Sequence, residues 1–132
     1  MIIGIGLDLV DLRRFAAFRA RWQGRGMERL FTAAELEDCM ARVDPVPSLA
    51  VRFAAKEAFF KALGTGFGRG GAWTDVEVRR VEGGAPTLSL SGRARMLAAR
   101  RGVTGVHVSL THSVSAAAAE VILEGDGRPD AA

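Results

Sequence analysis

The most informative stretch of the sequence is Phe53-Ala54-Ala55-Lys56-Glu57-Ala58-Phe59-Phe60-Lys61-Ala62-Leu63-Gly64-Thr65-Gly66. Residues 49–63 contain no glycine or proline and Gly64 follows them, so this stretch predicts a helix that ends at Gly64. It also holds both lysines of the chain, which has sixteen arginines. A chain with this bias keeps lysine where a compact, strongly hydrated charge is needed rather than a planar guanidinium.

Glu57 is the first candidate for chemistry on this helix. It lies four residues before Lys61, so the two side chains share a face. Phe53 and Phe60 lie on the same side, and we therefore expect a half-buried carboxylate that needs a cation, either Lys61 or a metal ion. Two interpretations stay open: an ordinary salt bridge near a helix C-terminus, or part of a metal-dependent phosphate site beside the glycine-rich turn.

The N-terminal residues predict a strand with two different faces. Apolar residues alternate with glycines and an aspartate: Ile3, Ile5, Leu7 and Leu9 against Gly4, Gly6 and Asp8. The two glycines leave room for another group to approach the backbone closely. Asp8 and Glu57 together could hold one Mg²⁺, which usually takes one or two protein carboxylates plus phosphates and waters. Alternatively, Asp8 bonds nearby backbone amides.

The remaining pattern predicts an α+β fold with a mostly antiparallel sheet packed with helices. Further helices are expected from Leu12 after the N-cap Asp11, from the capping box Thr32–Glu35 to about Arg42, and from the cap Ser91 to Gly102, while Ser48 is expected to cap the lysine-bearing helix. Further strands are expected at residues 73–81, 87–90, 103–111 and 116–123, with a hairpin turn at 82–84. We expect one domain, residues 1–123, and a flexible polar tail, residues 124–132.

The composition limits the protein's surroundings. The net charge is only +3, and the single cysteine, Cys39, can form no internal disulfide and lacks a CxxC partner for zinc. Residues 1–8 lack a basic region, so we expect no signal peptide. No apolar run approaches membrane-spanning length. These features favour a cytoplasmic protein that does not enter a membrane.

Arginines dominate a second predicted helix. Leu12, Phe15 and Trp22 are expected to be buried, whereas residues 13–29 carry six arginines and one acid, Glu28. Such a face is either simply solvated or a dock for an acidic partner, with Phe18 as an apolar anchor. No nucleic-acid motif accompanies it.

Two further features suggest phosphate contacts. Thr111 and His112 lie at the end of a predicted strand, where His112 is either a capping histidine or a donor to a phosphate. Residues 66–71 match G-x-G-x-x-G, but they follow a helix and precede a strand, the reverse of a dinucleotide-binding unit. The Gly64-Thr65-Gly66 backbone remains a surface that could face a phosphate.

Three blocks, in this order, resemble the holo-acyl-carrier-protein synthases, the small 4′-phosphopantetheinyl transferases of fatty-acid biosynthesis. They are residues 4–10 (Gly4 to Val10), residues 52–66 (Arg52 to Gly66), which are the most specific, and residues 108–113 (Val108 to Ser113). Together they cover about a fifth of the chain. The resemblance implies a 4′-phosphopantetheinyl transferase-like fold. It also implies a homotrimer with active sites between subunits, because a longer form of the family fuses two such halves.

The resemblance also implies roles for individual residues. Asp8 and Glu57 ligate Mg²⁺ together with coenzyme A phosphates, and a serine of apo acyl carrier protein attacks the β-phosphate and releases 3′,5′-ADP. Lys61 stabilises the bridging oxygens or protonates the leaving phosphate, while a metal-bound water or Glu57 takes the serine proton. The expected residues for coenzyme A are Arg52, Lys61, Gly64, Thr65, Gly66, Thr111 and His112. Those for the acidic carrier protein are Arg13, Arg14, Phe18, Arg21 and Arg25.

One departure and two alternatives stand beside this interpretation. Ala85 precedes Pro86 at a position where the family often has a basic residue, so the positive charge that the family often carries at this turn is in doubt here. The first alternative is an arginine-rich nucleic-acid-binding module, against which the two carboxylates speak because they repel phosphates unless a metal intervenes. The second is an inactive scaffold, against which the intact set of Asp8, Glu57 and Lys61 speaks.

Overall fold

The computed structural model describes residues 1–22, 25–66, 69–81 and 83–129. Its elements follow in this order: β1 (Ile2–Asp11), α1 (Leu12–Arg21), α2 (Arg25–Leu30), α3 (Ala33–Met40), α4 (Val46–Leu63), the 3₁₀ turn η1 (Trp73–Asp75), β2 (Val76–Arg79), β3 (Thr87–Leu90), α5 (Gly92–Arg100), β4 (Val103–His112) and β5 (Ala116–Gly125). All strand pairs are antiparallel, in one sheet of order β1-β5-β4 and one hairpin of β2 and β3. The predicted α+β class is confirmed.

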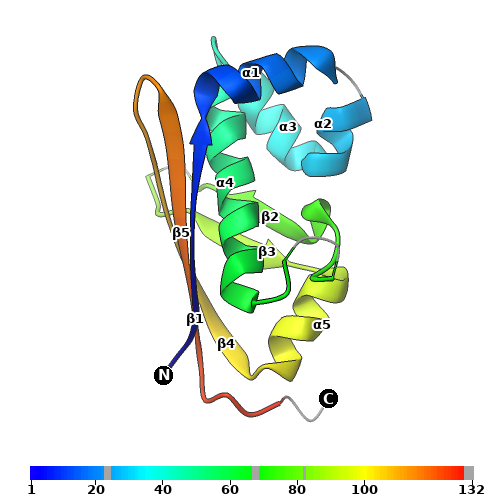
Figure 1. Ribbon diagram of the computed structural model, residues 1–132, viewed down its shortest axis with the longest axis vertical. Helices are drawn as coiled ribbons and strands as arrows, with labels where there is room; N and C mark the ends of the chain where they lie inside the picture. Colours follow the sequence, from blue (N-terminus) through cyan, green and yellow to red (C-terminus); the bar gives the residue numbers. More distant parts are fainter. Residues whose placement is uncertain (23–24, 67–68, 82, 130–132) are drawn as a thin grey trace.

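Helix α4 is the element on which the others are assembled. It runs along one face of the three-stranded sheet, with α1 to α3 gathered at its N-terminal end and the β2–β3 hairpin and α5 beside its C-terminal half (Figure 1). Both hydrophobic clusters of the core contain α4 residues. Gly64, in the left-handed conformation at φ 82°, ends the helix as predicted. No helix in the described part of the chain is both long and apolar enough to cross a membrane.

The glycines of β1 let α4 approach the strand backbone. A Cβ atom at Gly6 would lie 1.8 Å from the Ala58 carbonyl oxygen, and one at Gly4 would lie 2.0 Å from that of Ala62. The group that approaches the glycine face is therefore the protein's own helix. The apolar face of the strand is exposed instead, with Leu7 and Leu9 pointing away from α4.

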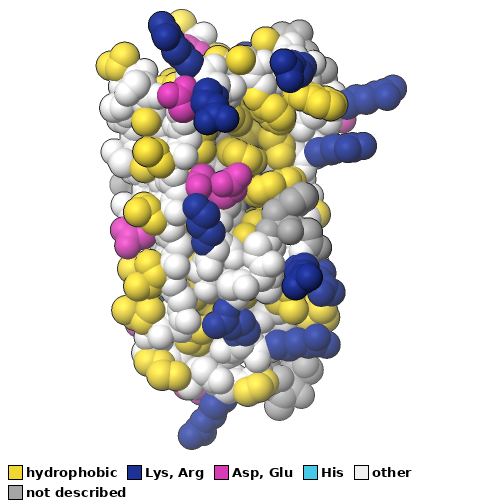
Figure 2. All heavy atoms as spheres, viewed as in Figure 1, with side chains coloured by type: hydrophobic (Ala, Val, Ile, Leu, Met, Phe, Trp, Pro, Cys, Tyr) yellow, Lys and Arg dark blue, Asp and Glu magenta, His cyan; other side chains and the backbone are white. Residues whose placement is uncertain are grey.

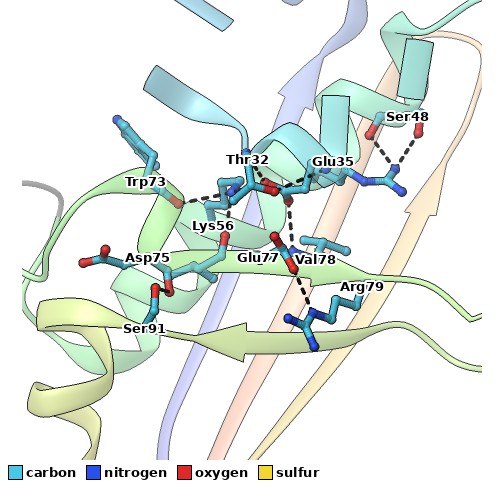
Figure 3. A network of polar contacts seen from close by, with 12 residues as sticks. Thr32, Glu35, Ser48, Lys56, Trp73, Asp75, Glu77, Val78, Arg79 and Ser91 are labelled. Carbon is cyan, nitrogen blue, oxygen red and sulfur yellow. Dashed lines mark hydrogen bonds and ion pairs between the residues drawn. The ribbon is translucent and has the colours of Figure 1, made fainter. Parts of the chain in front are cut away.

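A buried ionic network joins α3, α4 and β2 (Figure 3). Lys56 Nζ donates to Glu35 Oε1 at 2.7 Å, and both side chains are fully buried. Glu35 also completes the predicted capping box with Thr32, and its other oxygen accepts from the Val78 amide. One of the two lysines is therefore part of the core rather than of a surface.

Several sequence-based boundaries were wrong for local reasons. Ser48 does not cap α4, because Pro45 precedes the first turn and the Ser48 hydroxyl, buried inside the helix, accepts from Arg52. The strand expected from Trp73 begins only at Val76, because η1 comes first. Trp22 is 53% exposed rather than buried, since it follows the last turn of α1.

Other expectations concern longer segments. The arginine-bearing segment is two helices, α1 and α2, and residues 23–24 lie outside the described residues. The expected tail starts too early, because β5 continues to Gly125, whose amide bonds the Met1 carbonyl oxygen. Residues 67–68 of the glycine-rich run, residue 82 of the predicted hairpin turn and residues 130–132 of the tail also lie outside the described residues.

The β1–α4 contact predicts a strong effect of a single methyl group. We expect Gly6→Ala to lower the free energy of unfolding by about 3 kcal/mol, because the new Cβ meets a backbone oxygen that cannot rotate away. Urea denaturation followed by circular dichroism measures this. Gly105→Ala is the matched control in β4, where a Cβ has no neighbour closer than 3.4 Å, and should change stability by less than about 0.5 kcal/mol. Equal effects of the two substitutions would contradict the close-packing argument.

Candidate active site

Asp8, Glu57 and Lys61 meet where β1 crosses α4. The glycine face of β1 continues into Asp8, whose side chain is 9% exposed. Lys61 Nζ donates to Asp8 Oδ1 at 2.9 Å and to the Leu7 carbonyl oxygen at 3.0 Å. The hydrogen bonds of Lys61 therefore go to β1 rather than to Glu57, so the ordinary helix salt bridge is not the arrangement found.

The charges of this group are unbalanced. Burial, followed by the negative charge of Asp8 and a hydrogen bond with Asp8, raises the pKa of Glu57 from 4.5 to about 7, although Lys61 lowers it. The hydrogen bond to Asp8 is also the main cause of a raised pKa for Lys61, which stays protonated. Asp8 Oδ2 is buried and accepts no hydrogen bond from the described residues. When both carboxylates are ionised, they face one ammonium and leave a site of net negative charge.

This donor set fits a magnesium ion. The described residues contain no cluster of three or more His, Cys, Asp or Glu side chains suited to a metal. Mg²⁺ commonly takes only one or two carboxylates and completes its shell with phosphates and water. The buried, unpartnered oxygen of Asp8 and the half-buried Glu57 supply those two carboxylates.

Two hollows lie on either side of Glu57. One, of about 460 Å³, is lined by both carboxylates together with Asp11, Arg14, Phe15, Phe18 and Phe53. The other, of about 410 Å³, is lined by Glu57, Phe60, Lys61, Gly66 and Trp73. In the face shown in Figure 2, acidic side chains lie near the middle, with hydrophobic side chains above them and a basic side chain below. Glu57 is therefore accessible from both hollows, and Asp8 from the first.

The structure brings the Gly64–Gly66 turn to this site. Gly64 ends α4 one turn after Phe60, and Gly66 lines the second hollow with Lys61. Thr65 lies between them and is partly exposed. Trp73, which sequence reasoning treated only as the start of a strand, lines the same hollow. No local signal could have identified it, because it comes ten residues after the helix and reaches the site only through the fold.

Other predicted residues lie elsewhere in the single chain. Thr111 and His112 are exposed on β4, and β5 separates β4 from β1. Asp8 and Leu110 both pair with Ala119 of β5, and His112 lies two residues beyond Leu110. The His112 backbone is therefore two strand spacings across the sheet and two residues along it from Asp8, which is about 12 Å. Arg52 is 1% exposed and donates to Ser48 and Asp38, so the structure does not bring it to the hollow beside Lys61.

The arginines of the first two helices remain at the surface. Arg14 lines the first hollow next to the carboxylates. Phe18, 39% exposed, lines the same hollow and packs against Phe15 with a centroid distance of 6.1 Å. The other expected dock residues, Arg13, Arg21 and Arg25, are exposed. A basic surface with one aromatic side chain therefore borders the candidate site.

Known proteins match almost the whole chain. The family model of the 4′-phosphopantetheinyl transferase superfamily matches residues 4–119. A relative from Desulforudis audaxviator, named holo-[acyl-carrier-protein] synthase, is 50% identical over 125 residues, which are 95% of each protein. A crystal structure of a holo-(acyl-carrier-protein) synthase from Bacillus anthracis, in complex with coenzyme A (3′,5′-ADP), is 35% identical with a TM-score of 0.78, covering 96% of this chain and 99% of that one. The holo-[acyl-carrier-protein] synthase of Neisseria meningitidis is 31% identical with a TM-score of 0.86, covering 94% and 99%. The expected family and fold are confirmed.

The raised pKa of Glu57 predicts that the metal-free protein loses stability as the pH rises. The folded-state pKa of about 7 lies above the ordinary 4.5, so the stabilisation is complete below pH 4.5 and is lost as the pH passes 7. Glu57→Gln removes this titration. We expect the Tm of Glu57→Gln relative to wild type, measured in EDTA, to rise between about pH 5 and pH 8. Glu28→Gln, at an exposed position, should give a flat difference, and a flat difference for Glu57→Gln would contradict the assignment.

Proposed function

The chain belongs to the 4′-phosphopantetheinyl transferase superfamily, and from that premise we propose that it transfers 4′-phosphopantetheine from coenzyme A to a serine of apo acyl carrier protein, releasing 3′,5′-ADP. The observation that carries the proposal is the group of Asp8, Glu57 and Lys61 between two hollows. One hollow then takes the donor and the other the acceptor. We assign the reaction to fatty-acid biosynthesis in the cytoplasm, in keeping with a single free, buried cysteine.

Asp8 and Glu57 are proposed to hold Mg²⁺. Carboxylate oxygens are ligands that Mg²⁺ prefers, and the two ionised carboxylates exceed the one ammonium group in charge. The buried Asp8 Oδ2 also lacks a hydrogen-bond partner among the described residues. When bound, the ion supplies positive charge that neutralises the phosphate oxygens of the donor. Without that charge, the two carboxylates would repel coenzyme A phosphates.

The chain's own residues then position the reactants and move protons. The serine oxygen forms a bond to the β-phosphorus, and the bond from that phosphorus to the oxygen of the departing 3′,5′-ADP breaks. Glu57 is proposed to accept the serine proton. Lys61, whose side chain is 54% exposed and whose pKa is raised by Asp8, gives a proton or a hydrogen bond to the leaving phosphate. Positioning and charge neutralisation account for most catalysis of phosphoryl transfer.

The donor is proposed to occupy the hollow that Lys61 and Gly66 line. The Gly64-Thr65-Gly66 backbone follows the C-terminus of α4, and Gly66 lines this hollow, so we propose that amides of this turn contact phosphate oxygens there. The carrier protein is proposed to bind at the other hollow. Arg14 and Phe18 line it, and Arg13, Arg21 and Arg25 are exposed nearby on α1 and α2. An acidic carrier fits this basic surface, and such attraction weakens with salt.

A homotrimer is proposed to complete the site. The outer face of β1 exposes Ile5, Leu7 and Leu9 by 57%, 63% and 71%, which is an unusually apolar surface for an isolated chain. A second copy that covers this face would bring its own β4 with it. Thr111 and His112 of one copy could then reach the donor bound to another, which accounts for their distance from Asp8 in a single chain.

Intact-mass spectrometry tests the transfer directly. We expect an apo acyl carrier protein, incubated with this protein, coenzyme A and Mg²⁺, to gain one phosphopantetheine arm. We expect EDTA to prevent the gain, and Glu57→Gln to slow it by at least about 10²-fold without changing the circular dichroism spectrum. No gain with several carrier proteins would refute the function. Full activity in EDTA or in Glu57→Gln would refute the metal assignment.

The carrier dock predicts a selective kinetic effect. We expect Arg14→Glu to raise the KM for the carrier protein about tenfold at low salt, with kcat nearly unchanged, because it reverses an attraction that acts on binding. Arg95→Glu is the control, since Arg95 is exposed on α5 at the other end of α4 from α1 (Figure 1). An unchanged KM for Arg14→Glu would remove Arg14 from the dock.

The proposed assembly predicts the mass in solution. Sedimentation equilibrium should give three times the 14.0 kDa of one chain. Leu7→Glu should shift the mass toward one chain, because it places a charge in the middle of the covered face. A wild-type mass of one chain, or no effect of Leu7→Glu, would contradict the proposed interface.

A further inference from the structure

Trp73 forms part of the wall between two cavities at the candidate site. It lines the hollow with Glu57 and Lys61, and it also lines a groove of about 600 Å³ that Phe18 and Leu30 border on the other side. This groove is mainly apolar. The position of Trp73 therefore sets the shape of the space next to the carboxylates.

Aromatic contacts hold the Trp73 ring on the face of α4 that carries Glu57. The ring centroid lies 5.1 Å from that of Phe53 and 5.6 Å from that of Phe60. Phe53 precedes Glu57 by four residues and Phe60 follows it by three, so all three side chains share one helical face. These contacts hold the ring, but they do not explain what holds the backbone of the turn from which Trp73 projects.

Lys56 holds that backbone. Its ammonium group donates to the Trp73 carbonyl oxygen at 3.1 Å and to the Val76 carbonyl oxygen (Figure 3). Trp73 begins the turn η1 and Val76 directly follows it. The third donation goes to Glu35 Oε1. Lys56 is fully buried and uses all three ammonium hydrogens within the protein, so it does not touch a substrate.

Glu35 connects the same lysine to two other elements. Glu35 Oε1 also accepts from the Thr32 amide at 3.0 Å at the start of α3, and Oε2 accepts from the Val78 amide at 2.9 Å in β2. A buried ion pair is often no more stable than an apolar pair of the same volume. Its best-attested use is to fix one arrangement among several, and here the arrangement fixed is that of η1 on α4.

We propose that Lys56 and Glu35 are positioning residues that hold η1 on α4, so that Trp73 shapes the donor cavity for the uncharged pantetheine arm of coenzyme A. The inference rests on the proposed function, which puts coenzyme A in the hollow beside Lys61. Within that hollow, the arm is assigned to the side lined by Trp73 and Phe60, because an uncharged chain suits aromatic side chains, whereas the phosphates need Lys61 and the carboxylate-bound cation.

Two ligands separate this role from general stabilisation. Coenzyme A carries the pantetheine arm and 3′,5′-ADP lacks it, so a change confined to the Trp73 wall should affect only the first. We expect Lys56→Met and Glu35→Gln each to raise the Kd for coenzyme A about tenfold and to leave the Kd for 3′,5′-ADP within about twofold. Isothermal titration calorimetry with Mg²⁺ and no carrier protein measures both constants below the Tm of each variant.

Asp38→Asn is the matched control. Asp38 forms the other ion pair between α3 and α4, with Arg52, and makes no contact with η1 through that pair. It should therefore lower the Tm without changing the selectivity for coenzyme A over 3′,5′-ADP. If Lys56→Met does not fold, Glu35→Gln, which keeps the volume and one acceptor oxygen, carries the test.

The outcomes distinguish the inference from the function on which it rests. Weakened binding of coenzyme A alone, in Lys56→Met or Glu35→Gln and not in Asp38→Asn, supports the positioning role. Equal weakening of both ligands, or no weakening of either, overturns it while wild-type binding leaves the proposed function intact. If the wild-type protein binds neither ligand with Mg²⁺, both the proposed function and the positioning role are refuted.

Discussion

The contact between the backbones of β1 and α4 is the constraint on which the rest of the structure depends. At Gly6 and Gly4 the strand lies directly against carbonyl oxygens of the helix, at distances that exclude any side chain. Asp8 is two residues beyond Gly6 on the same face of the strand, and Glu57 directly precedes the helix residue whose carbonyl meets Gly6. The register of this contact therefore sets the distance between the two carboxylates, and a single added methyl group would increase it.

Because the same contact brings the two carboxylates together, it lowers the stability of the metal-free protein. Two carboxylates share one ammonium in a partly buried place, and the raised pKa of Glu57 reports that its charged form is disfavoured there. Proteins retain such unfavourable arrangements where they are functional. A cation that binds only the folded state would return the lost stability. The metal-free protein is accordingly under electrostatic strain at the place where the proposed chemistry occurs.

Local patterns in the sequence were sufficient to predict most elements and to single out Asp8, Glu57 and Lys61, which the structure brings together at the candidate site. The absence of helix breakers before Gly64, the alternation of residues 3–9 and the capping box at Thr32 each correspond to an observed element. The spacing of residues in the sequence could not predict which side chain pairs with each charged side chain. Lys61 bonds Asp8, 53 residues away, and Lys56 bonds Glu35, 21 residues away. Such pairs depend on tertiary packing, and the proposed role of His112 further depends on the proposed assembly of copies.

The two lysines show how one helix combines a structural and a chemical role. They are five residues apart, which turns their side chains by about 140° around α4. Lys56 therefore faces the core and Lys61 the open side of β1. Each donates to a carboxylate and to at least one backbone carbonyl. These acceptors converge on one point, and such an arrangement suits an ammonium group better than a planar guanidinium. Arg52, by contrast, spreads its donors over Ser48 and Asp38. At these two positions the acceptors fit the ammonium group of lysine better than the guanidinium group that the chain uses elsewhere.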